Sequence, residues 1–127
     1  MKITLPIYYI RKYKTKKDKK FLVWLNRFRN AHFFEVNEVK KHYHDLVQQQ
    51  VTWSCTSMIY PVYNIYIKSK NTDYHNVRSI IEKFVLDWLV ACWYIVDDSF
   101  DYVKSESTNP YIDKENPRCE IFINETP

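Results

Sequence analysis

The chain has 127 residues, is 46% hydrophobic and 17% aromatic, and carries a formal net charge of +4. That length suits one domain spanning residues 1–127, and the apolar content argues against a disordered chain. The absence of glycine excludes a glycine-rich phosphate loop, and it leaves Asn and Asp for turns that need a positive φ.

The sequence also argues against a membrane protein, a secreted protein and a cysteine-based scaffold. The longest apolar run, Trp88–Val96, is roughly half the ~20 residues that a membrane-spanning helix requires. No small-residue cleavage site follows the apolar N-terminus, so we expect a cytoplasmic protein with no membrane partner. The three cysteines are far apart and form no CxxC pair, which predicts neither a zinc ribbon nor disulfides.

Positive charge gathers near the N-terminus. Residues 3–10 (ITLPIYYI) predict a first strand, and Pro6 places that strand near an edge or a bulge. The next segment, Arg11–Lys20 (RKYKTKKDKK), holds seven bases and one acid, so its charge is +6 and the rest of the chain sums to −2. We expect a loop that either contacts a phosphate backbone or is only a solvated surface segment. In the first case its DNA-binding residues are Lys12, Lys14, Lys16, Lys17, Lys19 and Lys20.

A first helix is predicted between Asn30, a favourable N-cap residue, and Gln50. Within it, apolar residues recur every three or four positions. The preceding apolar run, Phe21–Leu25, suits either a strand or a packed loop. Two bases, Arg27 and Arg29, lie between them, where they suit either a phosphate contact near the helix N-terminus or surface salt bridges.

The central part of the chain predicts a strand followed by a helix. Thr52–Ser57 is expected to be a connector, and Met58–Lys68 (MIYPVYNIYIK) alternates and is rich in strand-forming residues. A second helix, capped by Asp73 or Asn76, has an apolar stripe that continues to Cys92.

Two short strands are predicted near the C-terminus, at Phe100–Lys104 and Cys119–Ile123. A polar loop around Asn109, Pro110 and Pro117 joins them. The expected order is therefore β-α-β-α-β-β. This order is typical of an α+β fold with a small mixed β-sheet and two helices packed on it.

Acidic residues flank the second predicted helix. Asp73 precedes the helix, and Asp97 and Asp98 follow it. The three carboxylates converge only if the chain after the helix folds back along the sheet. If they do, they suit one or two divalent ions that assist phosphodiester hydrolysis, with Lys83 or Arg78 near the phosphate. Otherwise Asp73 is only a helix cap, and the other two are turn residues.

Residues 73–76 (DYHN), the helix after them and residues 93–98 (WYIVDD) together resemble the motif of the RusA-type Holliday junction resolvases. The stronger similarity covers about Ile65–Val103, and Arg11–Lys20 corresponds to an insertion. The resemblance implies a small α+β homodimer that binds four-way DNA junctions and cuts them with Mg²⁺ or Mn²⁺. Members of the family are common in phages and prophages.

Carried over by position, the resemblance implies that Asp73, Asp97 and Asp98 hold the metal and that Asp73 and Asp98 are catalytic. The family's helix lysine falls on Lys83, with Arg78 as the alternative. The motif asparagine falls on Asn76, and Asn76 and Arg78 join the residues expected to contact DNA.

His75 departs from the family motif, because it stands where the family has its second aspartate. An imidazole is neutral and softer than a carboxylate, so as a metal ligand it favours Mn²⁺ over Mg²⁺. Three interpretations follow: His75 is an adapted ligand, the protein has lost catalysis, or His75 packs in the core.

Three hypotheses about function follow from these patterns. The first is a metal-dependent endodeoxyribonuclease that resolves branched DNA in phage recombination or replication. The second is a catalytically inactive RusA-like protein that binds DNA or a host protein. The third is a small interaction protein unrelated to resolvases, which predicts that Asp73 does not converge with Asp98.

Overall fold

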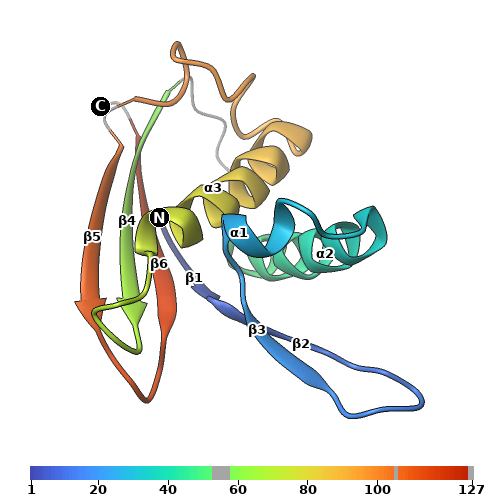
Figure 1. Cartoon of the computed structure of the whole chain (residues 1–127). Coiled ribbons are helices and arrows are strands. Elements are labelled where there is room, and N and C mark those ends of the chain that lie inside the picture. Colours follow the sequence, from blue (N-terminus) through green and yellow to red (C-terminus); the bar gives the residue numbers. More distant parts are fainter. Residues whose placement is uncertain (53–57, 105, 126–127) are drawn as a thin grey trace.

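The computed structural model describes residues 1–52, 58–104 and 106–125, and it is a mixed α+β fold (Figure 1). Its main sheet has four strands in the order β1-β6-β4-β5. Strand β4 pairs in parallel with β5, whereas β6 is antiparallel to both of its neighbours. The strands are β1 (Lys2–Pro6), β4 (Ile59–Ile67), β5 (Ser107–Ile112) and β6 (Arg118–Glu125).

Strand β4 forms the centre of the sheet, as the alternation of residues 58–68 predicts. Its odd-numbered residues are buried and its even-numbered residues are half-buried, so only one face is fully covered. The helices cover that face (Figure 1). The expected connector Thr52–Ser57 lies almost wholly outside the described residues.

Two long helices, α2 (Phe33–Gln50) and α3 (Tyr74–Ala91), pack on the sheet, and a short helix α1 (Leu25–Phe28) packs beside α3. Both long helices were predicted, and α3 begins as expected, since Asp73 accepts a hydrogen bond from the Asn76 backbone N–H at 3.3 Å. The predicted cap of α2 at Asn30 is wrong. The cap is His32, two residues later, and α2 starts at Phe33. The His32 Nδ1 accepts a hydrogen bond from the Phe34 N–H at 3.3 Å.

The predicted first strand is divided in two at Ile7. Strand β1 joins the main sheet, whereas β2 (Tyr8–Arg11) pairs with β3 (Lys19–Leu22) in a separate antiparallel hairpin. Ile7 is fully buried, and its carbonyl accepts from the Val23 N–H at 2.8 Å, which fixes the bend. The basic segment is therefore only partly a loop, because Arg11, Lys19 and Lys20 lie in strands.

The predicted strand Phe100–Lys104 is wrong, because only Val103 forms an isolated bridge, with Ile59. The strand lies instead at β5, over residues that were predicted to form a loop around Asn109 and Pro110. Pro110 is tolerated there because β5 is an edge strand, where a missing N–H costs no ladder bond. Strand β6 confirms the prediction at Cys119–Ile123.

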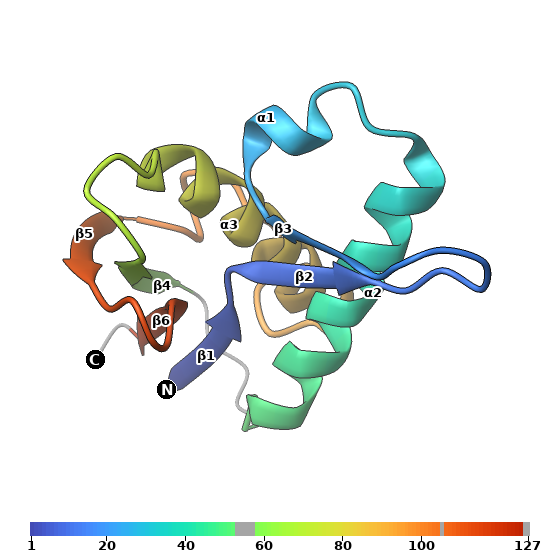
Figure 2. The ribbon, with the colours of Figure 1, turned by 60° about the horizontal axis from the view of Figure 1, so that its bottom comes forward.

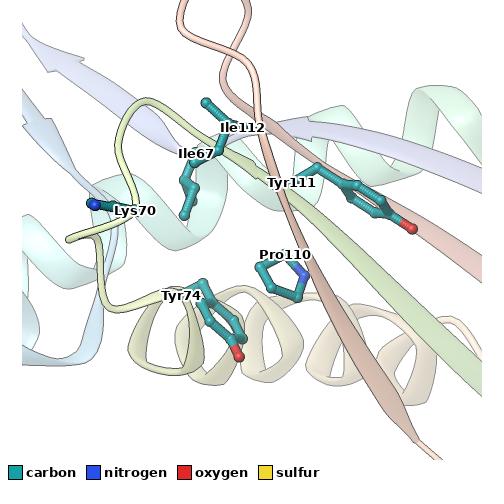
Figure 3. A pocket seen from close by; sticks show the side chains of 6 residues that line it. All are labelled: Ile67, Lys70, Tyr74, Pro110, Tyr111 and Ile112. Atoms are coloured by element: carbon teal, nitrogen blue, oxygen red, sulfur yellow. The ribbon is translucent and has the colours of Figure 1, made fainter.

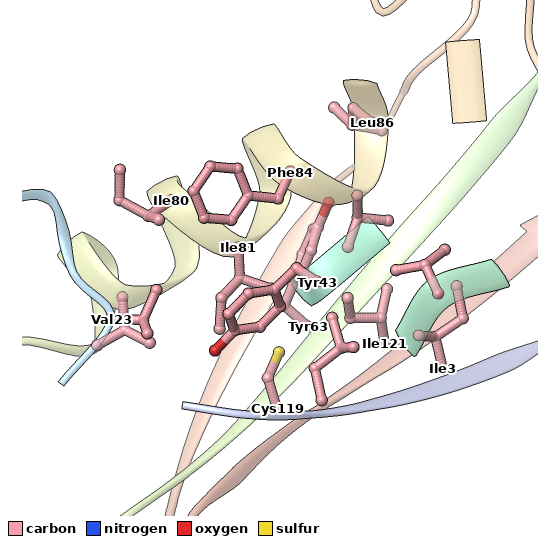
Figure 4. Close-up of a cluster of buried hydrophobic side chains, with 14 of the residues drawn as sticks. Ile3, Val23, Tyr43, Tyr63, Ile80, Ile81, Phe84, Leu86, Cys119 and Ile121 are labelled. Carbon is pink, nitrogen blue, oxygen red and sulfur yellow. The ribbon is translucent and has the colours of Figure 1, made fainter. Parts of the chain in front are cut away.

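These corrections add elements but keep the expected succession β-α-β-α-β-β among the others. The hairpin β2–β3 and helix α1 were not predicted, and the remaining elements follow one another as β1, α2, β4, α3, β5 and β6. Buried side chains from the sheet and both long helices form one apolar cluster, which includes Tyr43 and Tyr63 (Figure 4). Among the described residues, no helix is both long enough and apolar enough to cross a membrane.

Helix α3 ends in an unusual backbone conformation. Trp93 has a φ of 64°, and it is the only residue of the described ranges with a positive φ. The Tyr94 N–H then bonds to the Leu89 carbonyl at 2.9 Å, which closes the helix end. We expected Asn or Asp wherever a positive φ is needed, and that expectation is wrong here. The hydrogen bond that closes the helix requires a positive φ at position 93, which is a tryptophan.

Candidate functional site

Asp73 lies at the junction between β4 and α3, where it serves as a helix cap. Its carboxylate accepts from the Asn76 backbone N–H and, at 2.5 Å, from the Asn76 side-chain amide. The next motif residue, His75, is exposed, and its ring packs against that of Tyr74 with a centroid distance of 4.3 Å. The interpretation of His75 as a core residue is therefore wrong.

Asp97 and Asp98 follow α3 in an exposed turn, in which an Asp97 carboxylate oxygen accepts from the Asp98 N–H at 2.8 Å. The Asp98 charge is a minor cause of the raised pKa of Glu82, so Asp98 lies within electrostatic range of α3. Glu82, however, lies halfway along α3. At a rise of ~1.5 Å per residue, Glu82 is about 13 Å along the axis from Asp73.

The residues assigned to a metal by resemblance therefore lie in two places. Asp73 and His75 are at the start of α3, whereas Asp97 and Asp98 follow its end, with Asp98 within electrostatic range of Glu82. Within the described ranges, no group of three or more His, Cys, Asp or Glu side chains could hold a metal ion. The four assigned residues are therefore not gathered into one group of this kind in this conformation.

The two bases considered for the phosphate also differ in their surroundings. Lys83 is exposed on α3 and forms no ion pair with a described residue. Arg78 is engaged by two carboxylates, Glu82 at 2.6 Å and Glu106, and its guanidinium lies over the Tyr63 ring. Arg78 therefore belongs to an ion-pair network within the protein, and its contact with DNA stays a prediction.

A pair of acids that sequence analysis missed lies beside this arginine. Burial, a hydrogen bond to Glu106 and nearby acidic charges raise the pKa of Glu82 to about 7, although Arg78 opposes the shift. The Tyr63 ring extends from β4 toward α3 (Figure 4), and its buried hydroxyl has no hydrogen-bond partner in the described parts of the chain. The Arg78–Glu82 pair is visible in the sequence as an i,i+4 spacing, but nothing there signals Glu106.

The basic hairpin, defined as Tyr8–Leu22 and called here the arm, projects beyond the body of the protein (Figures 1 and 2). The arm rests on α2 through Tyr9, whose hydroxyl donates to Glu38 at 2.8 Å. Burial and this hydrogen bond raise the pKa of Tyr9 to about 12, so its hydroxyl stays protonated. The base of the arm is therefore held by specific contacts.

Six lysines of the arm are available to a ligand. All are exposed, and none forms an ion pair with a carboxylate of the described residues: Lys12, Lys14, Lys16, Lys17, Lys19 and Lys20. Arg11 differs, because it lies 3.6 Å from Glu38. The Lys16 ammonium lies 4.3 Å from the Tyr13 ring centroid, which places a cation and an aromatic ring side by side on the arm.

The two arginines before α2 have different environments. Arg27 pairs with the buried Glu35 at 2.5 Å and lies over the Phe21 ring at 4.3 Å. It therefore links α1 to α2 and β3. This favours the salt-bridge alternative for Arg27. Arg29, at the end of α1, is exposed and has no ion pair within the described ranges, so it remains a candidate for a phosphate.

Comparisons with known proteins identify no family for this chain. A scan against protein-family models and a search of curated proteins both gave no match to this chain. Functional inference therefore rests on the residues and their arrangement.

Proposed function

We propose that this chain is a RusA-like protein that binds branched DNA, with the arm on the phosphate backbone. The observation that carries the proposal is the set of six exposed lysines without ion pairs on a projecting two-stranded ribbon. Each lysine near a phosphate releases condensed counterions, which favours binding. The expected cytoplasmic location remains part of the proposal.

The composition of the arm favours contact with the backbone rather than with bases. The major groove of B-DNA admits a two-stranded ribbon. Lys also contacts guanine there, but as a flexible point charge, whereas the more rigid contacts that read bases come from Arg, Asn and Gln side chains. Between Lys12 and Lys20 the arm has none of these three residue types. We therefore expect recognition of DNA shape with little preference for sequence.

Branched DNA enters the proposal through the resemblance of residues 73–98 to the RusA motif. The homodimer implied by that resemblance would carry two arms and present them to two DNA helices of one junction. A host protein as the partner is the alternative, and it requires no phosphate contact by the arm.

Metal-dependent cleavage of the junction is the second candidate function. It is favoured by the position of Asp73 at the N-terminus of α3, after β4, and by Asp98 lying within electrostatic range of that helix. Because the assigned ligands do not gather in the described conformation, cleavage requires Asp98 and Asp73 to approach when DNA binds. Binding without cleavage requires no such change.

The test is a binding and cleavage assay on a synthetic four-way junction, with Mg²⁺ and Mn²⁺ in parallel and a linear duplex of equal length as competitor. We expect the junction to be preferred and the preference to weaken in the double variant Lys16→Gln, Lys17→Gln. Nicks that disappear in Asp98→Asn would establish the second candidate. Binding to neither DNA would refute the proposed function.

A further inference from the structure

A pocket opens between the edge strand β5 and the first turn of α3, next to the Asp73 motif (Figure 3). Its volume is about 200 Å³, and it is lined by Ile67, Lys70, Tyr74, Pro110, Tyr111 and Ile112. Figure 3 shows Tyr74 and Pro110 beside each other across the pocket, with the Lys70 side chain directed away from them. The pocket thus combines an apolar interior and an aromatic wall with a cation at its margin.

The margin of this pocket is positively charged. A second hollow shares Lys70 and Ile112 with it, and adds Lys68 and Lys114. None of the three lysines has an ion pair with a carboxylate of the described residues. The neighbouring Asp113 is already engaged by Arg118 at 2.8 Å, so the charge of the lysines is not neutralised locally.

The basic margin is continuous with the arm. The ammonium groups of Lys20 from the arm and of Lys68, directly after β4, both lie over the Tyr8 ring, at 5.3 and 4.5 Å from its centroid. A DNA backbone that runs along the arm can therefore continue to the margin of the pocket over a surface that stays positively charged.

We propose that this pocket receives an unpaired nucleobase of the DNA bound by the arm, with the adjoining phosphates on Lys70 and its neighbours. A base is flat and apolar on its faces, so it suits the Tyr74 ring and Pro110, and every base stacks in the same way. The anionic backbone matches the three lysines. This inference rests on the proposed function and names a part of the DNA that it recognises.

The test measures the affinity of a fluorescent four-nucleotide thymidine oligomer and, separately, of a blunt duplex with and without an unpaired thymidine overhang. In the wild-type protein, stacking on the overhang is expected to tighten binding about tenfold. Ile112→Glu places a carboxylate at the pocket mouth, and it is expected to abolish the gain and leave blunt-duplex affinity within about twofold. Lys70→Gln removes a cation from the margin, and it is expected to reduce the gain.

Two control variants match these changes elsewhere on the surface. Val96→Glu introduces an acid at a residue that is 56% exposed, close to the 55% of Ile112. Lys41→Gln removes an exposed lysine from α2. Both controls are expected to retain the full preference for the overhang, and circular dichroism confirms that all four variants are folded.

The outcomes separate the pocket from the proposed function. Oligomer binding that is lost in Ile112→Glu supports the pocket even if no junction is bound. Junction binding with an oligomer affinity that is equal in all variants overturns the pocket and leaves the proposed function intact. That second outcome is also the one expected if the pocket receives an apolar side chain of a protein partner.

Discussion

The side chains of Glu82 and Glu106 are hydrogen-bonded to each other, although both are carboxyl groups. A bond of this kind requires one shared proton, which Glu82 can retain because burial and the bond raise its pKa to about 7. Arg78 pairs with both acids, and its positive charge reduces the electrostatic repulsion between them. The pair joins the middle of α3 to the segment that enters β5.

This pair predicts that the protein loses stability as the pH rises toward neutrality. The ordinary pKa of Glu82 is 4.5, so between that value and about 7 the folded state holds a proton that the unfolded chain releases. The free energy of unfolding therefore falls as the pH rises through this window. Urea unfolding at several pH values should show a shallower fall in Glu82→Gln, and an identical profile in the variant would contradict the prediction.

Two buried tyrosine hydroxyls predict opposite results for the same substitution. Tyr43 donates to the Pro6 carbonyl, so Tyr43→Phe leaves a partly buried acceptor without its donor and should cost about 1 kcal/mol. The Tyr63 hydroxyl has no partner within the described ranges, so Tyr63→Phe should leave stability unchanged or slightly increased. Urea unfolding of both variants compares them directly, and equal losses would refute the assignment.

The positive φ of Trp93 predicts that glycine stabilises the end of α3. A side chain in the left-handed region costs about 1 kcal/mol, and glycine avoids that cost. Trp93→Gly should therefore raise the free energy of unfolding by about 1 kcal/mol relative to Trp93→Ala, which also removes the ring but keeps Cβ. Equal stabilities of the two variants would show that the backbone is not strained at this position.

The exposed lysines of the arm predict a strong salt dependence of DNA binding. Each phosphate contact contributes about 0.9 to the slope of log affinity against log salt concentration. The double variant Lys16→Gln, Lys17→Gln should therefore lower the slope by up to about 2, whereas Lys41→Gln on α2 should leave it unchanged. A slope that is unaltered in the double variant would mean that the arm is only a solvated segment.

Local patterns in the sequence were sufficient for several elements. The alternation of residues 58–68 predicted β4, and the helical spacing after Asp73 predicted α3 together with its cap. The same reasoning failed for the cap at Asn30 and the strand at Phe100–Lys104, where the local sequence is compatible with more than one structure. Contacts with distant residues selected among these structures.

Strand β5 shows the limit of local reasoning. Its sequence, STNPYI, contains turn-forming residues, and it becomes a strand by pairing with β4. The Asn109 side chain donates to that of Asn64 at 3.1 Å, across 45 positions of the chain. No short-range pattern encodes a parallel pairing of this kind, because the two strands are joined by a whole helix.

The candidate sites divide in the same way. The sequence by itself determined the basic character of the arm, the two candidate caps Asp73 and Asn76, and the apolar stripe of α3, because these depend on neighbouring residues. Only the tertiary structure decided that Asp98 lies near Glu82, that Arg78 is engaged by two acids, and that Tyr74 meets Pro110 in a pocket. Side chains far apart in the sequence meet only after the sheet has set the path of the chain.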